Sequence, residues 1–101
     1  MHFSGQVNQY LATLEDELET YRGLVPLAEN LQIPLSDHRN AIEQYASDLD
    51  SLQDEFEYNA QHVEECKNLI ENIIEKRKNL DREVKNKKGN ISQALTTKKV
   101  R

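Results

Sequence analysis

The chain has 101 residues and a net charge of −5; 31% of its residues are charged, 37% are hydrophobic, and it has one cysteine and no tryptophan. This composition is typical of long helices and excludes a large globular core, so we expect a single domain that associates with another chain. The first residues lack the features of a secretion signal, and no window approaches the ~20 apolar residues of a membrane span. We therefore expect an intracellular protein, cytoplasmic or nuclear, without a membrane span.

The first predicted element is an amphipathic helix over residues 1–32. Its apolar residues recur at alternating spacings of four and three, the pattern of a helix that packs against another helix. They are Val7, Leu11, Leu14, Leu18, Tyr21 and Val25. Ser4 is the expected N-cap. Gly23 and Pro26 both disfavour a helix interior, so we expect a kink or a short break near these two residues.

Residues 33–36 are predicted to form the connecting turn, because Pro34 disfavours helical geometry at the residue before it. Ser36 is expected to cap a second helix, predicted over residues 37–88 and about 80 Å long. Gly89 followed by Asn90 is a typical stop signal. We expect residues 89–101 to form a basic, partly ordered tail.

A seven-residue hydrophobic repeat runs along the second predicted helix from Ile42 to Ala94. One register comprises Ile42, Leu49, Phe56, Val63, Ile70, Arg77, Val84 and Ile91, and the other comprises Tyr45, Leu52, Asn59, Cys66, Ile73, Leu80, Lys87 and Ala94. Such a repeat is typical of a coiled-coil seam. The predicted fold is therefore all-α: an elongated antiparallel helical hairpin, with a short kinked first helix and a long second helix that carries coiled-coil heptads.

The lengths of the two helices predict where a partner binds. The first helix, at about 42 Å, covers only the first half of the second. Facing residue numbers should sum to about 67, which pairs Val25 with Ile42, Leu18 with Leu49 and Leu11 with Phe56. From about Val63 onward the long helix has no cover from its own chain. The predicted partner interface is Val63, Cys66, Leu69, Ile70, Ile73, Ile74, Arg77, Leu80 and Val84.

Charge is divided sharply along the chain. Residues 1–66 hold fourteen acidic and two basic side chains, a balance of −12, whereas residues 67–101 hold four acidic and eleven basic ones, a balance of +7. Folding the first helix back sets acid beside acid, so we expect basic residues of another chain to offset this field. In an antiparallel homodimer whose paired numbers sum to 136, Arg77 faces Asn59 of the second copy. A different helical partner explains the charge division equally well.

The basic residues also suggest an alternative role. A patch along the second half of the long helix is of the kind that grips nucleic acid or an acidic protein surface such as a microtubule. It comprises Lys76, Arg77, Lys78, Arg82, Lys85, Lys87 and Lys88. No aromatic residue follows Tyr58, so base stacking is not expected. A solvated helix face that matches an acidic partner is the simpler interpretation.

No arrangement of residues indicates catalysis. His62 and Cys66 are four residues apart, a spacing found in metal sites, but two ligands do not make a zinc site, and we interpret Cys66 as a core residue. We expect neither a cofactor nor a small-molecule substrate. The predicted function is that of a non-enzymatic coiled-coil protein, a structural or adaptor subunit that pairs with another helical chain in a homo-oligomer or hetero-complex. The alternative is a module whose basic half docks on nucleic acid or another polyanion.

Overall fold

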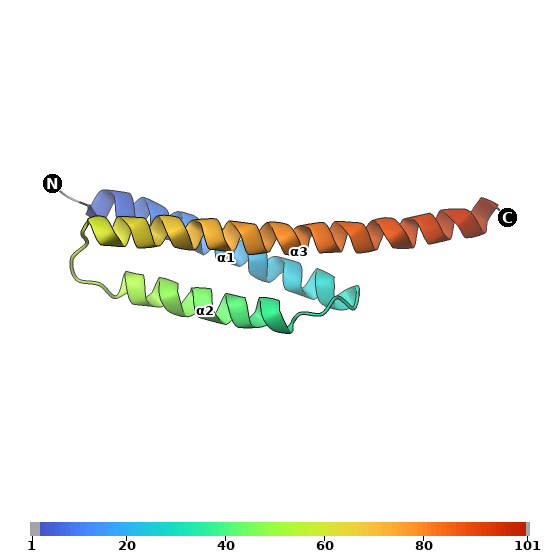
Figure 1. Ribbon diagram of the computed structural model, residues 1–101, viewed down its shortest axis with the longest axis horizontal. Coiled ribbons are helices and arrows are strands. Elements are labelled where there is room, and N and C mark those ends of the chain that lie inside the picture. Colours follow the sequence, from blue (N-terminus) through green and yellow to red (C-terminus); the bar gives the residue numbers. More distant parts are fainter. Residues whose placement is uncertain (1–2, 101) are drawn as a thin grey trace.

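The computed structural model describes the backbone of residues 3–100 and the side chains of residues 3–89. Over these residues the chain forms three helices: α1 (Ser4–Asn30), α2 (Ser36–Gln53) and α3 (Ala60–Val100). They run up, down and up, so α1 and α3 are parallel and α2 is antiparallel to both (Figure 1). The molecule measures 68 × 22 × 15 Å. The predicted all-helical class is confirmed, but the chain forms three helices where a two-helix hairpin was predicted.

The helix predicted over residues 37–88 is divided at residues 54–59, between α2 and α3. A continuous helix would place Asp50, Asp54 and Glu57 on one face at spacings of four and three, where like charges repel. The negative end of the α2 dipole makes these carboxylates still less favourable. These like charges weaken a continuous helix, and the chain reverses here although residues 54–59 contain neither proline nor glycine.

The reversal at residues 54–59 is stabilised by side chains that flank it. The Tyr58 hydroxyl donates to the carbonyl oxygen of Leu52 at 2.9 Å, and the amide of Glu55 donates to the same oxygen at 3.4 Å, at the end of α2. Asn59 caps α3: its Oδ1 accepts the amide of His62 at 3.2 Å, and the amide of Asn59 donates to Nδ1 of His62 at 2.9 Å. This reciprocal pair is a capping box in which His62 replaces the usual Glu or Gln. Asn59, predicted to lie in the seam, is instead a helix cap.

The turn between α1 and α2 closes α1 with a Schellman motif. The amide of Ile33 donates to the carbonyl oxygen of Ala28 at 3.0 Å, and the amide of Gln32 donates to that of Glu29 at 3.0 Å. Gln32 has φ of 62°, in the left-handed region that glycine normally occupies. The predicted turn at 33–36 is thus found, but α2 begins at Ser36 itself, and neither Ser4 nor Ser36 forms a capping side-chain bond.

Two expected interruptions do not divide the helices. Pro26 lies within α1, which continues to Asn30 because Ala28, beyond it, is fully buried in the core. Gly89 lies within α3, which continues to Val100, whereas we expected a stop there. The side chains of the predicted tail from residue 90 onward lie outside the described residues. The helical backbone, however, crosses both predicted break points.

The core lies mainly between the parallel helices α1 and α3. Buried residues of α1 include all but one of the predicted apolar stripe, namely Val7, Leu11, Leu14, Leu18 and Tyr21. The predicted α1–α2 register is also found: Glu15 accepts a bond from Gln53, and Arg39 pairs with Glu29, so facing numbers sum to 68. Phe56, expected opposite Leu11, lies instead in the α2–α3 connection.

Candidate interaction surfaces

Most of the predicted partner interface is covered by the chain itself. Six of its nine residues are buried in the core shared with α1: Val63, Cys66, Leu69, Ile73, Leu80 and Val84. Ile70, Ile74 and Arg77 remain half-exposed. The prediction that the chain leaves this seam uncovered was wrong because α3 folds back beside α1. In this fold, most of the seam therefore packs within the chain itself.

Arg77 shows how the seam accommodates a charge. Its Nε donates to Oε2 of Glu17 at 2.7 Å, and the two side chains are only 22% and 24% exposed. Residue 77 of α3 thus lies level with residue 17 of α1, an offset of sixty residues. This offset places acidic residues of α1 beside the basic stretch at 76–78. Arg77 of the same chain thus offsets part of the acidic charge of α1, and it is not available to face Asn59 of a second copy.

A hydrogen-bonded network joins all three helices. Tyr21 of α1 and Nδ1 of His38 of α2 lie 2.6 Å apart, and Nε2 of His38 lies 3.2 Å from the Glu83 carboxylate of α3. In the Nε2-protonated tautomer, the tyrosine hydroxyl donates to Nδ1, and Nε2–H donates to Glu83. Burial, with smaller effects of Tyr45 and Glu83, raises the pKa of Tyr21 to about 12. The hydroxyl is therefore a stable donor, and the network fixes the position of α2.

Phe56 is the most exposed large apolar side chain among the described residues. It is 97% exposed in the connection between α2 and α3, where Glu55 and Glu57 flank it. The neighbouring parts of the connection are held in place: Tyr58 is bonded to the end of α2, and Asn59 and His62 form the capping box of α3. The phenyl ring thus contributes almost nothing to the core.

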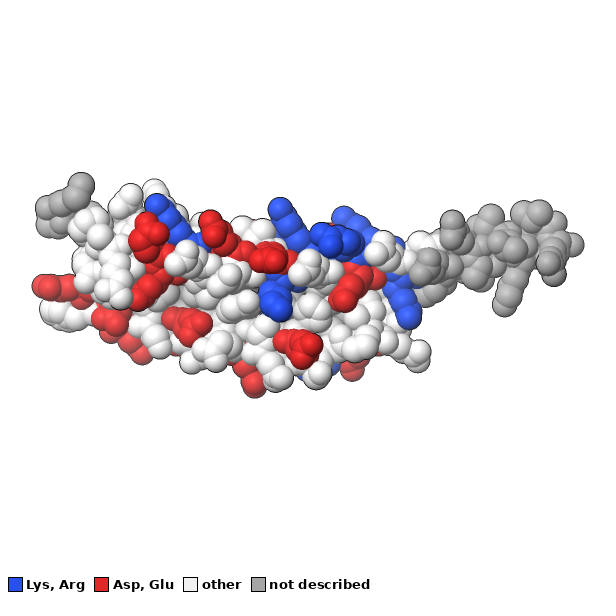
Figure 2. Space-filling view, viewed as in Figure 1, with Lys and Arg blue, Asp and Glu red and all other residues white. Residues whose placement is uncertain are grey.

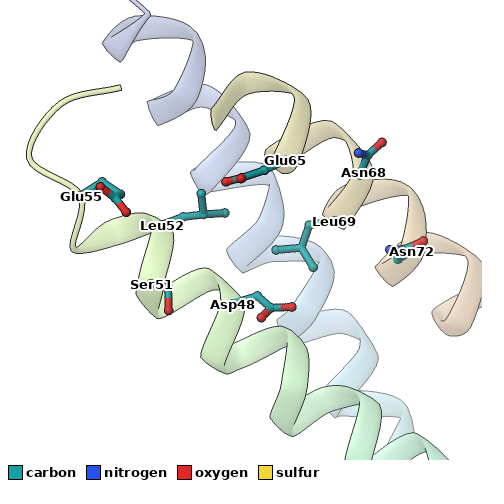
Figure 3. Close-up of a pocket in the computed structure, with 8 residues that line it drawn as sticks. All are labelled: Asp48, Ser51, Leu52, Glu55, Glu65, Asn68, Leu69 and Asn72. Carbon is teal, nitrogen blue, oxygen red and sulfur yellow. The ribbon is translucent and has the colours of Figure 1, made fainter. Parts of the chain in front are cut away.

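A groove of about 360 Å³ lies between α2 and α3 at the end of the molecule near this connection (Figure 3). Leu52 and Leu69 point toward one another at its floor. Around them, α2 contributes Asp48 and Ser51, the connection contributes Glu55, and α3 contributes Glu65, Asn68 and Asn72. We call these eight residues the acidic groove. Sequence reasoning missed it, because the reversal at residues 54–59 creates it.

The groove is electronegative. Asp48 and Glu65 accept hydrogen bonds from the neutral side chains of Gln44 and Gln61, and among the described residues no lysine or arginine forms an ion pair with its carboxylates. Nε2 of His62 lies 3.8 Å from Glu55. Burial, then the charges of Glu75 and Asp48, raises the pKa of nearby Tyr45. The groove is therefore suited to a cationic ligand rather than an anionic one.

The predicted basic patch lies on the exposed surface of α3, except for Arg77. Its exposed members are Lys76, Lys78, Arg82, Lys85, Lys87 and Lys88. Lys85 pairs with Asp81 at 3.1 Å on the same helix. On the face drawn in Figure 2, most basic side chains lie over the middle and C-terminal part of described α3, with a smaller group near the opposite end, and acidic side chains are spread along the length. Folding thus brings the acidic first part of the sequence alongside the basic α3, and the basic side chains that stay exposed lie mostly toward the end of described α3.

Cys66 and His62 have separate structural roles. Cys66 is fully buried, and this burial, with a smaller effect of Glu65, raises the pKa of its thiol. Nδ1 of His62 accepts a hydrogen bond from the amide of Asn59, and its Nε2 lies 3.8 Å from the carboxylate of Glu55. Over the residues that the structure describes, three or more metal-ligating side chains nowhere converge, and no helix has the length and apolarity needed to cross a bilayer.

Comparisons of the chain with protein-family models, with curated proteins and with solved structures returned no significant match.

Proposed function

We propose that the chain is a non-enzymatic interaction protein, a structural or adaptor subunit that pairs with another helical chain through the C-terminal end of α3. The supporting observation is the length of α3. With an offset of sixty residues between α1 and α3, the last residue of α1, Asn30, lies level with residue 90. Beyond that level α3 continues to Val100 with no other helix of the described chain beside it (Figure 1).

The projecting end of α3 is about 15 Å long. Helices in proteins are stabilised mainly by packing of an apolar face, so a projecting helix is a natural site for a second helix. The heptad repeat of the sequence continues into this segment with Ile91 and Ala94. Coiled-coil pairing by this end is therefore the mode of association that we propose.

Sedimentation velocity of the full chain tests this function. We expect concentration-dependent association of the wild type, or association with a helical partner, to be lost in the double variant Ile91→Asp with Leu95→Asp. The matched control, Gln93→Asp with Thr97→Asp, adds the same two charges at neighbouring positions outside the apolar repeat and should associate normally. Equal association of the two variants would contradict the role of this helix end.

A second function, docking on nucleic acid or another polyanion, is favoured by the six exposed basic residues of α3. Such binding weakens steeply with salt, because neutralising a phosphate releases counterions. Titration of a labelled duplex at 20 and 200 mM salt measures this property. Salt-sensitive binding that is lost in Lys78→Glu with Arg82→Glu would support this second function, and no binding at the lower salt would exclude it.

A further inference from the structure

The acidic groove and the basic end of α3 are complementary surfaces on one chain. Three carboxylates, Asp48, Glu55 and Glu65, surround the apolar floor of the groove. Lys85, Lys87 and Lys88 are exposed on α3, at the far end of the bundle. Within one molecule the two surfaces are too far apart to meet, because about 27 Å of straight helix separates Asn68 of the groove from the middle of these lysines.

We infer that the acidic groove of one copy binds the basic end of α3 of a second copy, with the two α3 helices antiparallel. This inference rests on the proposed function and deepens it by naming the partner and the receiving surface. A helix that carries several lysines within one turn matches carboxylates arranged on both sides of a groove. The docked helix would pack as a fourth helix over the acidic groove between α2 and α3.

The spacing of the two surfaces favours a closed pair. Each copy carries the same distance between groove and lysines, so a two-fold axis near the middle of α3 forms both contacts at once. Exposed residues along the same helix agree with this direction: Glu71 and Glu75 precede Lys78 and Arg82. An antiparallel copy therefore sets acid against base here too, whereas a parallel copy would set like charges together.

Charge reversal on the two surfaces separately provides the experiment. One variant carries Asp48→Lys with Glu65→Lys, and the other carries Lys87→Glu with Lys88→Glu. The surface control, Glu19→Lys with Glu43→Lys, changes the net charge as much as the first variant does, at exposed positions away from the groove. Sedimentation velocity of each full-length chain measures self-association, and circular dichroism melts confirm that each variant is folded.

We expect the wild type to dimerise, more weakly at 0.5 M salt than at 0.05 M. Each groove or α3 variant alone should bind itself at least about tenfold more weakly, because groove and helix end then carry like charge. An equimolar mixture of the two variants should dimerise again, since the mixed pair restores opposite charges at both contacts. The surface control should behave like the wild type.

Three results would overturn the inference. The first is a monomeric wild type at all concentrations, and the second is variants that dimerise like the surface control. The third is a mixture that stays as weak as its components. If the groove variants dimerise normally while Ile91→Asp with Leu95→Asp abolishes association, the inference about the groove fails and the proposed function stands. If neither set changes association, both fail.

Discussion

The Arg77–Glu17 ion pair provides a quantitative test of the parallel packing of α1 and α3. Arg77→Met keeps the apolar stem of the side chain but leaves the half-buried carboxylate of Glu17 without its cation. Exposed pairs contribute about 0.2–1 kcal/mol, and breaking a fully buried one costs about 3–5 kcal/mol. With the two side chains 22% and 24% exposed, we expect a loss of about 1–2 kcal/mol from either Arg77→Met or Glu17→Gln.

The double variant separates the pair from its surroundings. Urea denaturation of the wild type, both single variants and the double variant gives the coupling free energy, for which we expect about 1 kcal/mol. In a melt, each single variant should lower Tm by about 4–8 °C per kcal/mol. Lys78→Met is the matched control, because Lys78 is exposed and adjacent; its substitution should cost less than about 0.5 kcal/mol. Strictly additive effects of the two single substitutions would refute the parallel register.

Three further outcomes follow from single residues. Gln32→Gly should stabilise the fold by about 1 kcal/mol in urea titrations, since it removes the left-handed strain at φ 62°; no gain would contradict the Schellman geometry. Phe56→Ser should leave Tm within about 2 °C of the wild type, because the ring is 97% exposed; a large loss would show that the ring packs in solution. The pKa of Tyr21 is raised from 10.0 to about 12. Its contribution to the free energy of unfolding is therefore fully present below pH 10 and is lost as pH rises toward 12, a loss of at most about 2–3 kcal/mol. Tyr21→Phe should remove this alkaline loss of stability.

The first half of the fold could be predicted from local patterns. The stripe of α1, the turn near Pro34 and the register that brings Arg39 beside Glu29 all follow from helical periodicity and helix length. These features depend on neighbours in sequence and on one short connection. The sequence therefore contained enough information to place α1 against α2.

The second reversal could not be predicted from the repeat, because the repeat passes through it unchanged. Phe56 and Asn59 occupy heptad positions in the sequence, yet they lie in the connection, exposed or capping α3. The available signals were weak ones: carboxylates crowded near the end of α2, and an asparagine three residues before a potential capping side chain. Neither signal appears in the spacing of the apolar residues.

The missed reversal also explains why most of the predicted seam is buried within the chain and where another candidate surface lies. Once α3 returns beside α1, Leu80 and its buried neighbours complete the core, and Arg77 neutralises part of the acidic field of α1. That internal pairing leaves two surfaces without a lysine, arginine or carboxylate partner within the described chain: the carboxylates around Leu52 and Leu69, and Lys87 and Lys88 near the end of α3, whereas Lys85 pairs with Asp81. They lie at opposite ends of one elongated body, so the molecule is an electrical dipole along its length. When two such bodies lie side by side, the antiparallel arrangement attracts and the parallel one repels, and the antiparallel arrangement brings each lysine cluster to an acidic groove.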